Sequence, residues 1–258
     1  MNAMPQGTSA SQWFRVIRGG RTPGLRLVCF PHAGGSASFF RSWAQLLPDD
    51  VELLAVRYPG REDRIFEPPV EHMEELADSL AEACASLGGG PLAFFGHSMG
   101  ASVAYEVAAR MANAPGTAGP QALFVSGRGG PGKNQSRGLA TATDEELVGD
   151  LVAMSGTTAQ ALLNKELRDL LLPAVRADYR LVESYTASVP PPALDIPVYA
   201  YYGDADDKLD EDSVLAWSSA TRSAFAVRAF PGGHFYLEEQ AAPLVADLLA
   251  RLGTSTSA

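Results

Sequence analysis

The residues with the clearest chemical potential form the pentapeptide Gly96-His97-Ser98-Met99-Gly100. It follows an apolar run and precedes a stretch that favours helix, so the pattern Gly-x-Ser-x-Gly lies at a predicted strand-to-helix turn. In so tight a turn, a side chain two residues from the serine on either side would collide with the neighbouring strand or helix, which explains the two glycines. The pattern predicts that Ser98 is a nucleophile, with its hydroxyl held clear of the sheet.

A serine nucleophile needs a base to take its proton, and the base needs a third group to orient it. Among the four histidines, His234 alone follows the serine in the sequence. It lies in a glycine-rich loop directly after the last predicted strand, from which a base can reach over the sheet edge. His97 is interpreted as pointing away from the serine, and His32 and His72 precede the serine. His234 is therefore the predicted base.

The acid that would orient the base is expected in the loop after the penultimate predicted strand. That loop, Gly203-Asp204-Ala205-Asp206-Asp207, offers three carboxylates. The Gly-x-x-Asp spacing favours Asp206. Asp204 and Asp207 stay open as alternatives, because a shift of one residue in the turn would exchange them.

Acyl transfer through a serine also needs two backbone N–H donors for the negative charge that develops on the attacked carbonyl oxygen. One predicted donor is Met99, which follows the nucleophile at the helix N-terminus. The other is Ala33, in the loop Pro31-His32-Ala33-Gly34-Gly35. The small residues of this loop let its backbone approach a substrate.

Short apolar runs that alternate with helical patterns would position these residues. This alternation predicts the α/β class, with a mostly parallel central sheet covered by helices on both faces. Strands are predicted at 25–30, 51–56, 92–98, 122–126, 197–202 and 225–230, and helices at 71–87, 99–113 and 237–252.

The interval 127–196 contains no strand candidate and is too long for a plain connection between a strand and a helix. Helices are predicted at 145–154, 158–164 and 165–186. We interpret the interval as a helical lid that excludes water and shapes an acyl pocket, although an extra helical layer without a gating role is the alternative. It is inserted in a single domain over 12–252, and the tails 1–11 and 253–258 are predicted to be disordered.

Two local patterns define the lid. Thr143-x-x-Glu146 is a capping box that opens the first lid helix. The last lid helix is predicted to carry one apolar side, made of Leu167, Leu170, Leu171, Val175 and Tyr179. The run Gly127-Arg128-Gly129-Gly130-Pro131-Gly132 matches the dinucleotide-binding pattern Gly-x-Gly-x-x-Gly, but no helix follows it. We interpret that run as the hinge into the lid.

Composition excludes several classes of function. The net charge of −10 argues against nucleic acid and anionic membranes as partners. There is neither an apolar run long enough to span a membrane nor a secretory signal in the first 20 residues. Cys29 and Cys84 are predicted to be small buried hydrophobes in a reducing compartment, and no cluster of metal ligands is present. The expected location is the cytoplasm.

Several motifs occur in order and together resemble the type II thioesterases of polyketide and nonribosomal peptide synthases. They are the runs 31–37, 58–64, 96–100 and 232–235, and the resemblance covers roughly residues 13–250. It implies an α/β-hydrolase fold and hydrolysis of acyl groups from the phosphopantetheine arm of carrier proteins, which removes misprimed or stalled chains. It also implies that Ser98, Asp206 and His234 form the catalytic triad, and that Ala33 and Met99 donate to the oxyanion. No cofactor is implied beyond the phosphopantetheine that the carrier brings.

The arginines Arg57, Arg61 and Arg64 could lie near the carrier protein or the phosphopantetheine phosphate. Local ion pairing with Glu62 and Asp63 explains them at least as well. Carrier proteins are commonly acidic, as this chain is, so we expect a weak and largely apolar contact with the lid. A monomer is the default expectation.

Other functions remain open at this point. A serine hydrolase of acyl-CoA or small esters, an acyltransferase or macrocyclising enzyme with the same triad, and a non-catalytic partner of the synthase are the alternatives. The acyl chain length and the synthase served are not predicted.

Overall fold

A seven-stranded sheet forms the centre of the computed structural model, which describes residues 9–20, 23–88, 90–133, 136–154, 162–188 and 191–254. The strand order is β1-β3-β2-β4-β5-β6-β7. All neighbouring pairs are parallel except β1 with β3, which is antiparallel, so the predicted mostly parallel sheet is confirmed. The strands are β1 (Phe14–Arg18), β2 (Leu25–Phe30), β3 (Val51–Val56), β4 (Leu92–His97), β5 (Leu123–Ser126), β6 (Val198–Gly203) and β7 (Phe225–Phe230).

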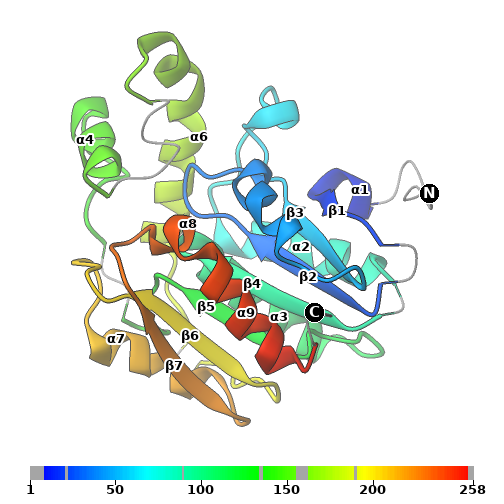
Figure 1. Ribbon diagram of the computed structural model, residues 1–258. Helices are drawn as coiled ribbons and strands as arrows, with labels where there is room; N and C mark the ends of the chain where they lie inside the picture. Colours follow the sequence, from blue (N-terminus) through cyan, green and yellow to red (C-terminus); the bar gives the residue numbers. More distant parts are fainter. Residues whose placement is uncertain are drawn as a thin grey trace.

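Helices cover both faces of this sheet. Helices α2 (Met73–Ser86) and α3 (Met99–Asn113) pack on one face, while the 3-10 helix η1 (Ala37–Gln45) and helix α9 (Ala241–Leu252) cover the other (Figure 1). Successive residues of a strand point to opposite faces, so Phe94 of β4 packs with the α2–α3 side and Phe95 packs with the η1–α9 side. The predicted two-layered cover of the sheet is therefore confirmed.

The N-terminal end of the chain differs from the prediction. Helix α1 (Ser9–Trp13) begins inside the segment 1–11 that was expected to be disordered, and it leads directly into β1. Ala10 and Trp13 are buried, so their apolar contacts order this part of the tail. Residues 1–8 lie outside the described residues.

The C-terminal end also differs in detail. The helix predicted over 237–252 is two helices, α8 (Tyr236–Glu239) and α9. Gly253 ends α9 in the left-handed conformation with a φ of 70°, and the Thr254 N–H donates to the Leu249 carbonyl at 3.1 Å. Of the predicted tail 253–258, residues 255–258 lie outside the described residues.

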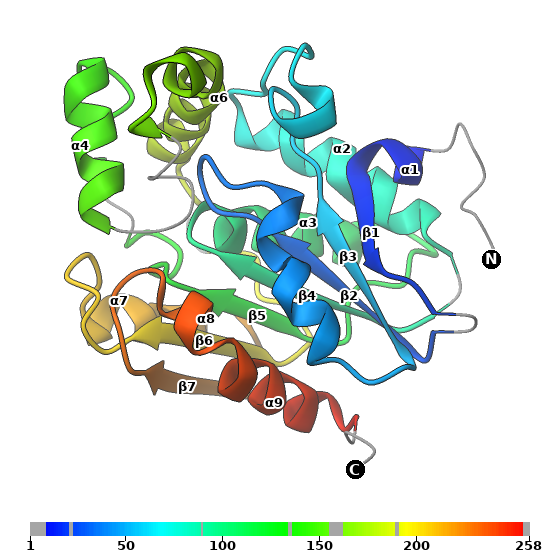
Figure 2. The same ribbon diagram turned by 45° about the horizontal axis from the view of Figure 1, so that its top comes forward.

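The lid interval contains α4 (Asp144–Met154) and α6 (Lys165–Ser184), which stand side by side beyond one end of the sheet (Figure 2). The capping box is confirmed, because Thr143 N donates to Glu146 Oε2 at 2.8 Å and Glu146 N donates to Thr143 Oγ1 at 3.3 Å. The two helices share a small apolar core of their own, which includes Leu147, Leu151 and Val175. Most of the short helix predicted at 158–164 lies outside the described residues.

The predicted apolar side of α6 is right at its C-terminal half and wrong at its start. Val175 and Tyr179 are buried, whereas Leu167 is 44% exposed and Leu170 is 52% exposed. Leu172 takes a buried position in the lid core instead. Among the described residues, no element buries Leu167 and Leu170 in the first turns of α6.

Short helices in the connections were not predicted. They are η1, η2 (Glu62–Arg64), α7 (Glu211–Leu215) and η3 (Ala216–Ala220). Cys29 and Cys84 are buried and free, as predicted. Within the described ranges, every helix is too short or too polar to cross a lipid bilayer.

Candidate active site

The turn after β4 holds Ser98 in a strained conformation. Its φ is 54° and its ψ is −118°, in a region that residues with a side chain rarely adopt, and α3 begins at the next residue. A Cβ on Gly96 would lie 2.1 Å from the Gly100 carbonyl oxygen, and a Cβ on Gly100 would lie 2.0 Å from the Phe30 carbonyl oxygen. The predicted collision at both glycines is therefore confirmed.

The base predicted from the sequence meets one of the three candidate carboxylates. The Nδ1 atom of His234 lies 2.7 Å from Oδ2 of Asp206, whose side chain is fully buried. Because a carboxylate accepts, Nδ1 carries the proton in this pair and Nε2 is left free to accept one. The Lys208 N–H donates to Oδ1 of Asp206 at 3.1 Å and fixes the carboxylate from its other side.

The other two carboxylates of this loop are placed elsewhere. Asp204 accepts the Gly232 N–H at 3.0 Å, and this bond closes the two loops on each other. Asp207 is exposed and lies 3.5 Å from the Lys208 ammonium. Of the three alternatives, the structure brings Asp206 to His234.

Both predicted oxyanion donors lie with the serine and the histidine around one cavity of about 330 Å³. Helices α4 and α6 and the run 127–133 supply much of the remaining wall. The lining residues are Ala33, Ser98, Met99, Gly127, Arg128, Gly129, Lys133, Arg137, Met154, Tyr179, Val182, Glu183, Lys208, Leu209, Asp210, Ser213 and His234. The cavity thus joins all the predicted site residues except Asp206, which lies behind the histidine.

Two further histidines lie close to this group. The ring centres of His97 and His234 are 5.0 Å apart, and those of His32 and His97 are 6.0 Å apart. Burial, with the charges of His234 and Arg61, lowers the pKa of His32 to about 3. Burial, with the charges of His234 and His32, lowers the pKa of His97 well below its usual range. Both rings are therefore neutral at neutral pH and add no charge beside the base.

A buried ion pair connects the lid to the loop that carries Ala33. Two nitrogens of Arg61 lie 2.7 Å from the two carboxylate oxygens of Asp178 in α6. Asp178 also accepts the Gly34 N–H at 2.7 Å, and Arg61 donates to the Gly35 carbonyl at 3.0 Å. Burial opposes the charge on Arg61, but the neighbouring Asp178 raises the pKa of the guanidinium above its usual value. The pair holds the loop of Ala33 and helix α6 in a fixed relation.

We expect the replacement Asp178→Ala to reduce the free energy of unfolding by about 3–5 kcal/mol, because it leaves the buried Arg61 charge unpaired. Denaturant unfolding measures this change. The control is Asp195→Ala, which breaks the exposed pair with Arg222 and should change the free energy of unfolding far less than Asp178→Ala does. Equal losses in the two variants would show that the buried pair holds the lid no more firmly than a surface pair does.

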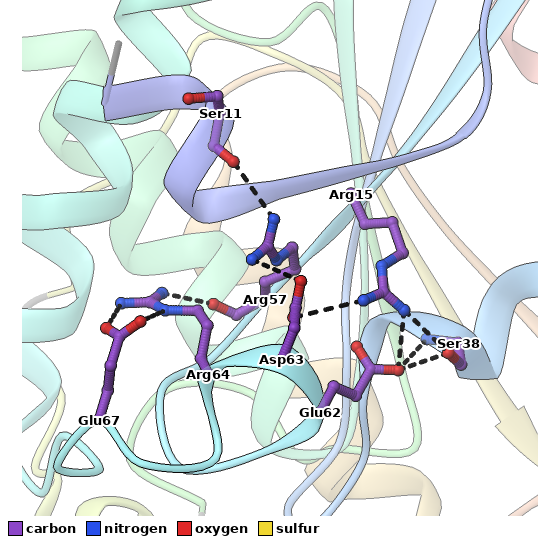
Figure 3. A network of polar contacts seen from close by, with 8 residues as sticks. All are labelled: Ser11, Arg15, Ser38, Arg57, Glu62, Asp63, Arg64 and Glu67. Atoms are coloured by element: carbon purple, nitrogen blue, oxygen red, sulfur yellow. Dashed lines mark hydrogen bonds and ion pairs between the residues drawn. The ribbon is translucent and has the colours of Figure 1, made fainter. Parts of the chain in front are cut away.

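The other two arginines of the cluster are held locally (Figure 3). Arg57 pairs with Asp63 at 2.8 Å, and Arg64 forms two bonds to Glu67, at 2.9 and 2.5 Å. Local ion pairing therefore accounts for Arg57 and Arg64, although the partner of Arg64 is Glu67 and not Glu62. For Arg61 the local explanation is wrong, because its partner lies in α6.

Known proteins are similar to this chain along nearly its whole length. The family model described as "Thioesterase domain" matches residues 25–252. The chain is 41% identical over 241 residues to thioesterase PikA5 of Streptomyces venezuelae, covering 93% of this chain and 85% of that protein. It is 34% identical over 233 residues to the gramicidin S biosynthesis protein GrsT of Aneurinibacillus migulanus, covering 90% of each.

Solved structures include a similar protein as well. The type II thioesterase BorB from the borrelidin biosynthetic cluster matches with a TM-score of 0.83 and 37% identity. The match covers 95% of this chain and 97% of that chain. The fold of nearly the whole chain is thus that of a known architecture.

Proposed function

The chain belongs to the thioesterase domain family, and we propose that it hydrolyses acyl groups from the phosphopantetheine arm of carrier proteins in polyketide or nonribosomal peptide biosynthesis. Its task there would be to remove aberrant or stalled acyl chains. One observation carries the proposal: the strained Ser98 turn and the His234–Asp206 pair meet at a cavity that the lid helices partly enclose.

In the first half of the proposed reaction, Ser98 Oγ attacks the thioester carbonyl carbon and His234 Nε2 takes the hydroxyl proton. The carbonyl oxygen becomes negative and accepts from the backbone N–H groups of Met99 and Ala33. The intermediate then collapses, the C–S bond breaks and the thiol leaves with a proton from His234. A thiolate is a good leaving group, so this proton transfer matters less than it does for an amine.

In the second half, a water molecule replaces the thiol. His234 takes a proton from this water, and the resulting hydroxide attacks the acyl-serine ester. The same two N–H groups stabilise the second oxyanion, and the Ser98 oxygen leaves with the proton from His234. Asp206 keeps the imidazole in one tautomer through both halves and stabilises the imidazolium that forms.

We also propose that the protein uses no cofactor of its own, because the phosphopantetheine arrives on the carrier domain and serine chemistry supplies the rest. Its partners are acyl or peptidyl carrier domains, and it works as a monomer in the cytoplasm. The exposed Leu167 and Leu170 at the start of α6 support a weak apolar contact between lid and carrier.

The test is to incubate the purified protein with an acyl-loaded carrier protein and, separately, with the matching acyl-CoA. Intact mass spectrometry follows the loss of the acyl group, and the Ser98→Ala variant controls for spontaneous hydrolysis. We expect faster release from the carrier at equal concentrations. Turnover of the CoA thioester without release from the carrier would identify a hydrolase of free thioesters, and transfer to an added alcohol or amine in preference to water would identify an acyltransferase.

A further inference from the structure

Arg128 is a cationic side chain in the wall of the cavity that holds Ser98 and His234. The Trp217 ring N–H donates to the Arg128 backbone carbonyl at 2.8 Å and fixes the chain at this point. The guanidinium itself donates one long bond, from Nε to the Ser102 hydroxyl at 3.2 Å. Its Nη2 atom is buried without a hydrogen-bond partner. The backbone of Arg128 is thus anchored, while most of its donor groups are unused.

No aspartate or glutamate of the described residues pairs with this charge. Arg128 takes part in no ion pair among the described residues, and the residues outside them include neither aspartate nor glutamate. Burial lowers the pKa of Arg128 to about 10, so the side chain is still protonated at neutral pH. Arg128 is half-buried, and its buried Nη2 atom has no hydrogen-bond partner. A buried, unpaired donor on a cation is unfavourable in a folded protein, and in a ligand cavity it calls for a ligand acceptor.

The two acidic residues of the cavity wall are occupied elsewhere. Glu183 accepts the backbone N–H groups of Arg137, Leu139 and Ala140. Asp210 caps α7 by accepting the Ser213 N–H at 2.6 Å. The second arginine of the wall, Arg137, pairs with Asp150, at 2.9 Å for one of its two bonds. Lys133 likewise has no ion pair among the described residues, but it is exposed to solvent. Arg128 therefore differs from the other charged groups of the wall in combining an unmatched charge with a buried donor atom.

We propose that Arg128 selects the acyl chain by donating to an oxygen on it, so that the enzyme prefers oxygen-bearing acyl chains over hydrocarbon chains of the same length. The inference rests on the proposed function and names its substrate class. The acceptor is a keto, hydroxyl or carboxylate oxygen. Apolar wall residues such as Met154, Val182 and Leu209 contact the hydrocarbon part of the same chain.

The test compares matched N-acetylcysteamine thioesters, which lack the phosphates of CoA and so present no other anion to the cavity. Hexanoyl, 3-oxohexanoyl and 5-oxohexanoyl thioesters place a carbonyl at different depths, and butyryl and succinyl thioesters differ by a terminal carboxylate. Each is measured with the unaltered protein, with Arg128→Met, and with Lys133→Met. Lys133 is an exposed cation of the same wall, so its variant controls for the general loss of positive charge.

We expect at least one oxygen-bearing substrate to exceed its hydrocarbon match in kcat/KM by on the order of 10- to 100-fold. Arg128→Met should bring that ratio close to one, because it slows the oxygen-bearing substrate much more than its hydrocarbon match, while Lys133→Met preserves the ratio. A keto or a carboxylate preference identifies the acceptor. No preference in the unaltered protein, or an equal fall for both members of a pair in Arg128→Met, would overturn the inference.

A binding measurement separates this inference from the proposed function. In the Ser98→Ala background, calorimetric titration with the preferred thioester and its hydrocarbon match should give the same selectivity, and adding Arg128→Met should remove it. This selectivity would stand even if hydrolysis failed for every substrate. The melting temperature of Arg128→Met should stay equal or rise, because an unpaired charge is removed. A marked fall in melting temperature, with no change in selectivity, would assign Arg128 a structural role instead.

Discussion

Replacing Ser98 with alanine is expected to lower kcat for an acyl-carrier thioester by about 10,000- to 1,000,000-fold. The change removes one oxygen atom from a turn whose strain belongs to the backbone, with a φ of 54°, so the fold keeps the same geometry. The base, its carboxylate and the two backbone donors remain, but no atom is left to form the acyl-enzyme. Any residual rate comes from direct attack by water.

Single-turnover mass spectrometry checks this expectation more directly than steady-state rates do. With a slowly hydrolysed acyl donor, the unaltered protein should gain the mass of the acyl group, and Ser98→Ala should not. The control is Ser86→Ala on the exposed end of α2, where the hydroxyl only donates to the Ala83 carbonyl. Near-full activity in Ser98→Ala, or an acyl adduct that persists in it, would end the serine mechanism.

The central strands were readable from the sequence because they are buried on both faces. The run 92–95 is continuous and apolar because β4 contacts helices on each side, and such runs stand out against their surroundings. Strand β1 gave no such signal. It lies at the edge of the sheet, and its Arg15 and Arg18 side chains form ion pairs with Glu62 and Asp49. Polar residues of this kind protect an edge and also hide it from a hydrophobicity pattern.

In the site, too, some features could be predicted from the sequence and others could not. The glycines around Ser98 are local requirements of a turn, so their spacing is visible in the sequence. The link between Arg61 and Asp178 is not local, because 117 residues separate the two side chains and neither belongs to a motif with the other. The exposure of Leu167 similarly depends on which elements pack against α6, which periodicity along the helix cannot show.

The choice among the three carboxylates after β6 could be predicted in part, because it depends on both the local sequence and a contact between distant loops. The sequence placed all three in the correct loop but could not fix the turn that selects one of them. The turn is set by close backbone contact, because a Cβ on Gly203 would lie 2.3 Å from the carbonyl oxygens of both Gly232 and Gly233. This contact brings the two loops together and directs Asp206 to His234, whereas Asp207 faces solvent.

The second large loss of kcat is therefore expected at Asp206, and its neighbour Asp207 provides the comparison. Asp206→Asn should lower kcat by about 1,000- to 10,000-fold, because an amide can donate to Nδ1 and favour the imidazole tautomer that cannot accept the Ser98 proton. Asp207→Asn makes the same chemical change one residue away on an exposed side chain and should alter kcat by less than about 3-fold. Parallel kinetics on one acyl-carrier substrate, with KM measured separately, compares the two.

The split between kcat and KM distinguishes an orienting carboxylate from a structural one. If Asp206 acts through His234, its amide variant should bind substrate with an unchanged KM while the chemical step slows. If Asp206 only supports the loop, the variant should lose stability and KM together, and a tautomer effect would be absent. A comparable loss of kcat in Asp207→Asn, with Asp206→Asn nearly active, would mean that the turn rearranges in solution and that the other carboxylate orients the base.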